Sequence, residues 1–411
     1  MPASLPAATP AEHIATLADQ CVMCGLCLPS CPTYRVSRTE AESPRGRIAF
    51  ARTLAAGADD VTLQTHLDQC LACRRCERVC PSGMAFGELL IETRTLLKTR
   101  TSARRGWLDR LVAKPARLRT AVRLGQALGA KHWLPTVIRR WAKPDSVLTR
   151  IAAEFPTLPT MTPLPAWTPG AGTGRGRVAL LAGCVASAFD RDTLVAAIKL
   201  LSAAGYGVAV PPSQGCCGAL ARHAGRLDEA RRIAAPTRSA LLDSGTDTVL
   251  VTASGCIDTL RDFTLAGTRL RVREIDEFLA QNADVARLRF RALARRAALH
   301  VPCTLANATG ADAATAALLA RIPQLVVLPL SPQPGCCGAA GDYFLRHAAI
   351  ADALRGETLD QVAALAPDLL LTSNIGCRLF LGNGLRRSGQ SIEVLHPVTL
   401  LARQLEIESA P

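Results

Sequence analysis

The sequence predicts a multidomain chain of the α+β and α/β classes, with a helical N-terminal domain, a basic helical linker and tandem α/β cysteine-rich repeats. Three observations lead to this fold class. One cysteine pattern occurs twice near the N-terminus, a basic stretch covers residues 94–150, and a second cysteine pattern recurs in the C-terminal half. At 411 residues, of which 49% are hydrophobic, the chain is long enough for two or three domains with separate cores.

The N-terminal domain, residues 1–93, is predicted from two copies of the pattern C-x2-C-x2-C-x3-C-P, which begin at Cys21 and Cys70. In bacterial two-cluster ferredoxins this run binds [4Fe-4S] clusters, and the fourth cysteine of each copy ligates the other cluster. The same exchange predicts two quartets of ligands, Cys21, Cys24, Cys27 and Cys80 for one cluster and Cys70, Cys73, Cys76 and Cys31 for the other. The alternative is a zinc site, but zinc ribbons pair two separate C-x2-C units. We therefore expect a ferredoxin-like domain with two [4Fe-4S] clusters.

The two motifs differ in the charge of the residues between their ligands. The first loop is apolar, whereas the second carries Arg74, Arg75 and Arg78. Positive charge beside a cluster stabilises its reduced state and raises its reduction potential. We therefore predict that the cluster at Cys70, Cys73 and Cys76 is the more oxidising one; the alternative is that these arginines only form a solvated surface.

Between the motifs, the run from Ser43 to Arg47 reads Ser-Pro-Arg-Gly-Arg. A serine followed by proline predicts the start of a helix with proline at its first position. The alternative interpretation is that Arg45 or Arg47 contacts a cluster or a partner protein.

The segment 94–150 carries most of the net charge, because it holds fifteen Lys or Arg residues and only two acidic ones. Its apolar residues recur near helical spacing, and Trp107, Trp133 and Trp141 lie among the basic residues. Such a composition is typical of amphipathic helices that lie on an anionic membrane surface. A docking face for a partner subunit and a solvated surface are the alternatives. We expect no nucleic-acid partner, because aromatic residues are only 4% of the chain and no recognition motif is present.

The chain contains no apolar run of about 18 residues, so we expect no membrane-spanning helix. Residues 1–20 carry neither the basic nor the apolar region of an export signal. We therefore expect the chain, with its sixteen cysteines, to lie in the reducing cytosol. Cysteines at these spacings then indicate metal or cluster binding.

A linker rich in Pro and Gly covers residues 151–176. It precedes two repeats, expected at residues 177–290 and 291–411, whose matching cysteines are about 120 residues apart. Short apolar runs such as 177–181 and 248–251 precede the cysteines and predict parallel strands alternating with helices.

Each repeat would place its cysteines at the carboxyl ends of strands, where parallel sheets bind ligands. The two predicted sites are Cys184, Cys216, Cys217 and Cys256 in the first repeat and Cys303, Cys336, Cys337 and Cys377 in the second. Four soft ligands suit an additional iron–sulfur cluster or zinc; the alternative is that these cysteines are small core residues.

No arrangement of residues suggests acid–base or nucleophilic catalysis, so we predict no catalytic residue. His223 and His347 follow the paired cysteines at unequal distances and are interpreted as surface or packing residues. His300 lies just before Cys303 and is not counted among the ligands, although it could support one.

The order of the two N-terminal motifs, the Ser43 to Arg47 element and the two Gly-Cys-Cys-Gly runs resembles the iron–sulfur subunit of glycolate oxidase over nearly the whole chain. The resemblance implies an electron-transfer subunit of a glycolate (2-hydroxy acid) dehydrogenase. FAD-containing partner subunits would oxidise glycolate to glyoxylate, and this chain, itself without flavin, would pass electrons to membrane quinone. It would lie in the cytoplasm, peripherally on the inner membrane.

Related families leave alternatives open, namely the iron–sulfur subunits of lactate and glycerol-3-phosphate dehydrogenases and a catalytic subunit like that of heterodisulfide reductases. In the latter, each repeat ends in C-x2-C and supplies a fifth thiolate. Here Thr259 and Phe380 stand at those positions. The resemblance therefore favours electron transfer over disulfide reduction.

Overall fold

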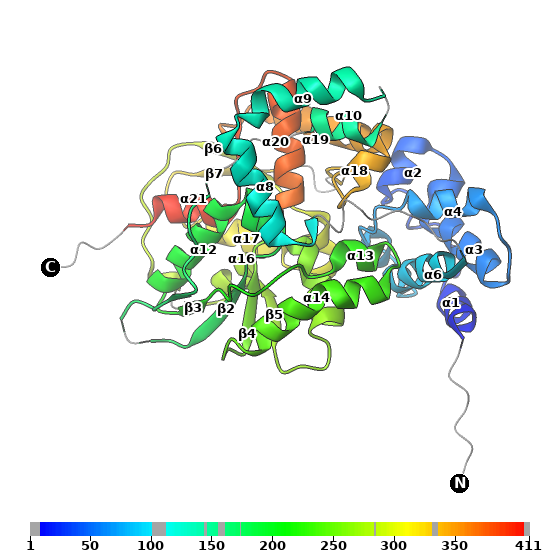
Figure 1. Ribbon diagram of the computed structural model, residues 1–411, viewed down its shortest axis with the longest axis horizontal. Helices are drawn as coiled ribbons and strands as arrows, with labels where there is room; N and C mark the ends of the chain where they lie inside the picture. Colours follow the sequence, from blue (N-terminus) through cyan, green and yellow to red (C-terminus); the bar gives the residue numbers. More distant parts are fainter. Residues whose placement is uncertain are drawn as a thin grey trace, which may run out of the picture. The chain divides into compact units, whose positions relative to one another are not determined.

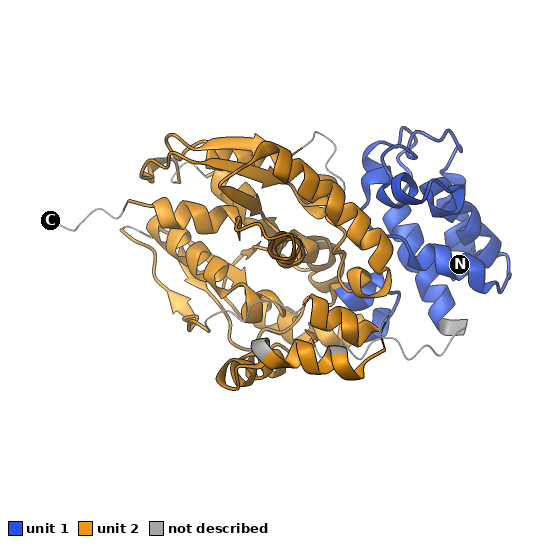
Figure 2. Cartoon of the chain, turned by 90° about the horizontal axis from the view of Figure 1, so that it is seen from above, with its two compact units in different colours: residues 1–106, 220–229 blue, residues 107–219, 230–411 orange. Residues whose placement is uncertain are grey.

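The computed structural model describes residues 9–100, 112–143, 146–154, 161–172, 174–282, 285–330 and 336–406. The chain divides into two compact units (Figure 2), with residues 1–106 and 220–229 in unit 1 and residues 107–219 and 230–411 in unit 2. Unit 1 is helical, and unit 2 contains two sheets flanked by helices. The predicted fold class is confirmed.

Unit 1 consists of short helices joined by the cysteine loops. The helices are α1 (Pro10–Asp19), α2 (Pro32–Ser37), a 3₁₀ turn (Glu40–Glu42), α3 (Pro44–Ala55), α4 (Val61–Asp68), α5 (Arg75–Arg78) and α6 (Phe86–Arg100). Their starts follow local capping rules. Thr9 caps α1 in a reciprocal bond with Glu12, and Ser43 accepts a hydrogen bond from the Gly46 amide ahead of Pro44. The predicted helix start at Ser43 is therefore confirmed.

The core of unit 1 holds these helices together and supports the cysteine loops. Ile14 of α1, Leu54 of α3 and Leu89 of α6 are fully buried in one apolar cluster. Cys21 and Cys70 pack against the edge of the same cluster. The loops thus start from fixed points at the ends of α1 and α4.

The first repeat in unit 2 forms a five-stranded sheet of order β1-β3-β2-β4-β5. Figure 1 labels the strands β2 to β5 of this sheet. Its strands are β1 (Trp167–Thr168), β2 (Arg177–Leu181), β3 (Gly207–Ala209), β4 (Thr248–Val251) and β5 (Arg271–Glu274). The associated helices are α11 (Ala186–Phe189), α12 (Arg191–Ala203), α13 (Ala219–His223), α14 (Leu227–Leu242), a 3₁₀ turn (Ser254–Cys256), α15 (Ile257–Thr259), a π turn (Leu260–Thr264), α16 (Ile275–Ala280) and a 3₁₀ turn (Val285–Arg287). Of these, most of α13 and the start of α14 fall in residues 220–229 and therefore belong to unit 1. All pairings are parallel except that of β1 with β3.

The second repeat forms a parallel four-stranded sheet of order β7-β6-β8-β9. Its strands are β6 (Arg296–His300), β7 (Val326–Pro329), β8 (Leu369–Thr372) and β9 (Glu393–Leu395). Its helices are a π turn (Leu305–Thr309), α17 (Asp312–Leu319), α18 (Tyr343–Arg346), α19 (Ala348–Leu365), α20 (Ile375–Arg387) and α21 (Pro397–Gln404). The predicted parallel strands before the cysteines are confirmed, whereas β1, β5 and β9 were not anticipated.

The two repeats share one apolar core. Leu180 and Leu200 of the first repeat belong to the same buried cluster as Leu299 and Leu401 of the second. Helix α12 packs against α21, and α16 packs against α17. The two contacts are reciprocal, because α12 and α17 follow the equivalent strands β2 and β6, and α16 and α21 follow β5 and β9, the last strands of their repeats.

The basic segment contributes α8 (Pro115–Ala127), α9 (Ala130–Trp141) and α10 (Val147–Ala153) to unit 2. Trp107 lies outside the described residues. Glu154, at the end of α10, is buried and accepts hydrogen bonds from Arg355 and Arg387 and from the Asn383 amide. The predicted helices are therefore confirmed where the chain is described, and α10 is attached to the second repeat. Among the described residues, no helix has the length and apolar character needed to cross a bilayer.

Candidate metal centres

The first cysteine quartet of unit 1 lines a hollow in the surface. Cys21, Cys24, Cys27 and Cys80 all border it, together with apolar residues of the first loop and Arg45. The loop turns tightly because Met23 and Gly25 both adopt left-handed backbone conformations, with φ of 58° and 82°. These two residues, one on each side of Cys24, let sulfurs that are three positions apart in sequence face one side.

The second quartet lines a neighbouring hollow. Cys31, Cys70, Cys73 and Cys76 border it, and Arg47, Arg74 and Arg75 also contribute to its wall. Here Ala72 and Arg74 take the left-handed conformations that Met23 and Gly25 take in the first loop. Cys76 borders both hollows. The two predicted ligand sets are thus gathered separately, and they lie side by side.

The donor atoms of both hollows suit iron–sulfur clusters. All sixteen cysteines lie in the described part of the chain, and none forms a disulfide. The residues found to line the hollows include no Asp, Glu or His. All-thiolate coordination is the ligation that [4Fe-4S] clusters use, so the residues present fit this group. The assignment of individual ligands remains a prediction.

Burial keeps several of these thiols protonated when no metal is bound. It raises the pKa of Cys27 to about 11 and that of Cys76 well above its usual value. Ligation requires the thiolate. The positive charge of a bound metal centre offsets the free-energy cost of burying the negative thiolate. Cys80 differs, since hydrogen bonds from Ser82 and nearby amides outweigh burial and lower its pKa.

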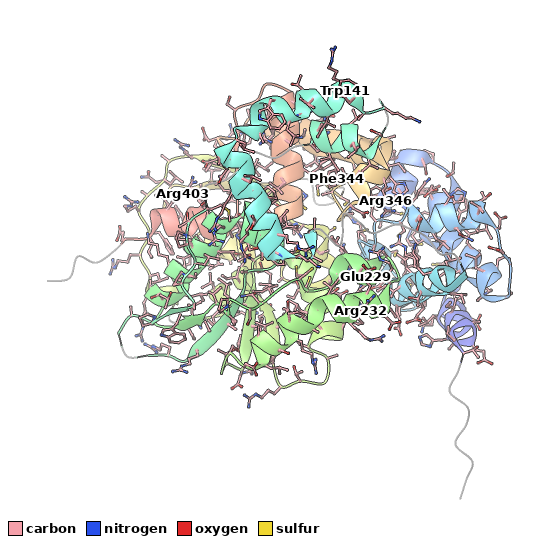
Figure 3. The ribbon with its side chains drawn as sticks, viewed as in Figure 1. Trp141, Glu229, Arg232, Phe344, Arg346 and Arg403 are labelled. Carbon is pink, nitrogen blue, oxygen red and sulfur yellow. The ribbon has the colours of Figure 1, made fainter. Side chains whose placement is uncertain are left out.

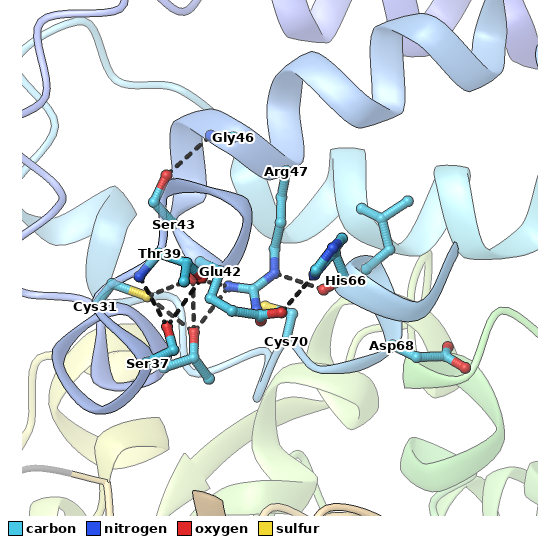
Figure 4. A network of polar contacts seen from close by, with 12 residues as sticks. Cys31, Ser37, Thr39, Glu42, Ser43, Gly46, Arg47, His66, Asp68 and Cys70 are labelled. Atoms are coloured by element: carbon cyan, nitrogen blue, oxygen red, sulfur yellow. Dashed lines mark hydrogen bonds and ion pairs between the residues drawn. The ribbon is translucent and has the colours of Figure 1, made fainter. Parts of the chain in front are cut away.

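Arg47 forms a buried network behind the second hollow (Figure 4). Its guanidinium, about 1% exposed, pairs with the Glu42 carboxylate and donates to Thr33 Oγ1 at 2.9 Å and to the His66 carbonyl at 2.8 Å. Thr33 Oγ1 in turn lies 3.3 Å from Cys31 Sγ. The same short element therefore starts a helix and, through Thr33, supports a candidate ligand, while contact of Arg45 or Arg47 with a cluster or a partner stays a prediction.

Each repeat of unit 2 brings its own cysteine quartet together at the carboxyl ends of its strands. In the first repeat, hydrogen bonds from Cys184 and Cys217 lower the pKa of Cys216. The pKa of Cys217 is raised because it donates to Cys216 and Cys256. These bonds join all four sulfurs of the predicted set.

The second repeat shows the same arrangement. Hydrogen bonds from Cys303 and Cys337 lower the pKa of Cys336, and Cys337 Sγ lies 3.0 Å from Cys377 Sγ. The paired cysteines are buried in both repeats. Clustering of four thiols in each repeat suits a metal or cluster, although the occupancy of these sites remains a prediction.

His300 is a further residue of the second site that sequence reasoning did not count. Its ring is 1% exposed at the end of β6, and one ring nitrogen lies within 4.8 Å of the sulfurs of Cys337 and Cys377. Burial lowers its pKa to about 4, so the ring is neutral at physiological pH. Its only sequence signal was its proximity to Cys303.

A buried acidic pair between the repeats was also missed. Glu274 caps α16 by accepting from the Asp276 amide, and Asp276 accepts a hydrogen bond from Thr315 of the second repeat. Burial raises the pKa of Asp276 to about 7 and that of Glu274 well above its usual value. His396 of the second repeat lies close to both carboxyl groups. Nothing in the sequence brings these three residues together, because they come from separate repeats.

Known families match the two parts of the chain that carry these sites. Residues 17–84 match the 4Fe-4S dicluster domain, and residues 178–261 and 297–382 match the Cysteine-rich domain. Together with the gathered thiols, these matches define an iron–sulfur protein with a duplicated cysteine-rich domain.

Several curated proteins are similar to this chain. The probable glycolate oxidase iron-sulfur subunit of Bacillus subtilis is 30% identical, covering 93% of this chain and 92% of its own length. The glycolate oxidase iron-sulfur subunit of Escherichia coli is 28% identical, with 94% of each chain covered. A lactate utilization protein A of Shouchella clausii is 24% identical over 54% of this chain and 98% of its own. The chain belongs to the glycolate oxidase iron–sulfur subunit family.

Proposed function

We propose that this chain is the electron-transfer subunit of a flavin-dependent glycolate dehydrogenase. A partner subunit with FAD would oxidise glycolate to glyoxylate, and this chain would pass the electrons toward membrane quinone. When bound, [4Fe-4S] clusters supply one-electron redox centres. The observation that carries the proposal is the pair of thiol-lined hollows that share Cys76, because adjacent centres allow electrons to pass between them.

The protein around each hollow gives the two centres different roles in this proposal. Cys24 is exposed and lies in a loop with Val22 and Leu26, which are 68% and 60% exposed. Cys31 of the second quartet is buried. The first centre is therefore suited to exchange electrons with another protein across an apolar contact, and the second to pass them within the chain.

Glycolate is favoured over the related substrates by the extent of similarity. The two relatives named for glycolate oxidase cover more than nine-tenths of this chain, whereas the lactate utilization protein covers 54% of it. A disulfide-reducing role is disfavoured by Thr259 and Phe380, which occupy the positions of the fifth thiolate and are buried there. Lactate and glycerol-3-phosphate dehydrogenation remain the alternatives.

Attachment to an anionic membrane surface is supported by the face of α8 and α9. Exposed apolar residues recur along these helices every four or five positions, namely Leu124, Leu128, Trp133, Val137 and Trp141. Trp141 lies at the C-terminal end of α9 and is 83% exposed (Figure 3). Arg123 and Arg140 are exposed on the same helices. Apolar and basic side chains together are what an anionic bilayer surface binds.

Three experiments test the proposal. The chain prepared without oxygen should contain at least about eight iron atoms, and glycolate should reduce its clusters only when the flavin-bearing partner is present. Reduction by glycolate without any partner, or an iron-free chain, would show the proposal to be wrong. Binding to vesicles of anionic lipid should weaken at high salt and in Trp133→Ser/Trp141→Ser, while neutral vesicles should bind neither protein.

A further inference from the structure

His300 stands where the cysteines of the second repeat converge. It is the last residue of β6, and its ring is buried against the thiols of the site. One ring nitrogen and the sulfurs of Cys337 and Cys377 all lie within 4.8 Å of one another. Three potential ligand atoms thus already meet at one point in the second repeat.

The two ring nitrogens of His300 have different surroundings. Nδ1 lies 2.9 Å from Thr372 Oγ1, the residue paired with His300 in the register of β6 and β8. Nε2 is buried and has no hydrogen-bond partner among the described residues. A hydrogen bond at one nitrogen fixes the tautomer and orientation of a ligating histidine and leaves the other nitrogen to bind metal. A buried polar atom without such a partner would cost free energy.

We propose that His300 Nε2 is a nitrogen ligand of the metal centre held by the second cysteine quartet, with Thr372 as the residue that orients the ring. This inference goes beyond the proposed function, because it requires in addition that the second quartet hold a metal. The ligand class is one neutral imidazole together with thiolates drawn from Cys303, Cys336, Cys337 and Cys377. Imidazole with three of these thiolates completes a tetrahedral zinc site, and imidazole can take the place of a thiolate on an iron–sulfur cluster.

The first repeat provides an internal comparison. β2 and β6 are equivalent strands, and Leu181 ends β2 where His300 ends β6. Leu181 cannot bind metal, so the inference makes the two repeat sites chemically unequal. Replacing thiolate by imidazole raises the potential of an iron–sulfur centre. A redox-active second site should therefore accept electrons more readily than an all-thiolate site of the same cluster type.

The test uses the full chain, prepared without oxygen and labelled with ¹⁵N-histidine. Pulsed electron paramagnetic resonance of the reduced protein detects histidine nitrogen bound to a paramagnetic cluster, and X-ray absorption at the zinc edge detects it for zinc. Cys377→Ser identifies the signal of the second site. His300→Leu copies the first repeat, and His396→Asn is the matched control because His396 is equally buried and both its nitrogens already contact backbone groups.

We expect a histidine nitrogen signal in the unmodified chain and in His396→Asn, and its loss in His300→Leu. Because the unmodified chain carries the decisive signal, a variant that fails to fold does not prevent the test. If Cys377→Ser removes a metal, and that metal shows no nitrogen ligand in the unmodified chain, the inference is overturned. The proposed function would stay intact in that case. A second quartet without metal would overturn the inference as well, while eight iron atoms and reduction through the partner would still support the proposed function.

Discussion

Replacing Arg47 by methionine should destabilise unit 1 strongly, because the change leaves a carboxylate buried without its main partner. The side chains of Arg47 and Glu42 are 1% and 5% exposed. The guanidinium also donates to the Glu42 carbonyl at 2.6 Å, to Thr33 and to the His66 carbonyl. Methionine has a similar length and no charge, so it fills much of the space without replacing these bonds.

The size of the effect follows from the burial of the pair. Removing one partner of a buried ion pair costs about 3–5 kcal/mol, since the remaining charge stays desolvated. His66 Nδ1 lies 2.6 Å from the other carboxylate oxygen and offsets part of this loss when it donates. We therefore expect about 3 kcal/mol for Arg47→Met. The double variant Arg47→Met/Glu42→Gln also removes the unpaired charge of Glu42. Its free energy of unfolding should be about 1–2 kcal/mol higher than that of Arg47→Met.

The assay is urea unfolding of the full chain, followed by the visible absorbance of the clusters so that unit 1 is observed. Arg45→Met is the matched control. Arg45 lies on the same helix and pairs with Glu40 at the surface, where the two side chains are 32% and 48% exposed. It should therefore change the midpoint little. Equal midpoints for Arg47→Met and Arg45→Met, or a double variant weaker than Arg47→Met, would refute the reasoning.

Three further predictions concern charge in other parts of the chain. Arg74→Gln/Arg75→Gln should lower the reduction potential of the centre at Cys70, Cys73 and Cys76 and leave the other potential unchanged, as measured by redox titration. Burial raises the pKa of Asp276 to about 7 in the folded chain, against 3.8 ordinarily. The folded state therefore binds a proton that the unfolded state has released, and the free energy of unfolding should fall as pH rises from about 4 to about 7. Asp276→Asn should flatten this pH dependence in thermal unfolding. Glu154→Gln should destabilise unit 2 by about 1–3 kcal/mol, because Arg355 and Arg387 lose a charged partner while Arg355 keeps its ion pair with Asp352 at 2.7 Å; an unchanged melting temperature would contradict this.

The cysteine quartets of unit 1 could be predicted because their spacing is a local property of the chain. Three ligands lie within seven residues, and the fourth follows four residues later. The strands before the cysteines of unit 2 were also predictable, because runs such as 248–251 are uninterrupted apolar stretches. In both cases the signal lies within a few neighbouring residues.

The remaining features depend on contacts between distant segments. The strand β1 was not expected in a Pro-rich and Gly-rich segment, and it forms because Trp167 and Thr168 pair with β3 and so become the edge of the sheet. The Arg47 network joins Glu42 to the His66 carbonyl across the space between the two motifs. No periodicity in the sequence records such pairings, which arise only when the helices pack.

The two repeats carry different residues at the ends of equivalent strands. His300 ends β6 where Leu181 ends β2, and His396 caps α21 where Glu274 caps α16. Strand interiors retain apolar residues in both copies because the shared core requires them. The carboxyl ends of parallel strands are free from this packing requirement, and they are also the edge at which such sheets bind ligands. Chemical differences between the two cysteine sites are therefore expected at these positions, and His300 is the one among them that contacts the thiols.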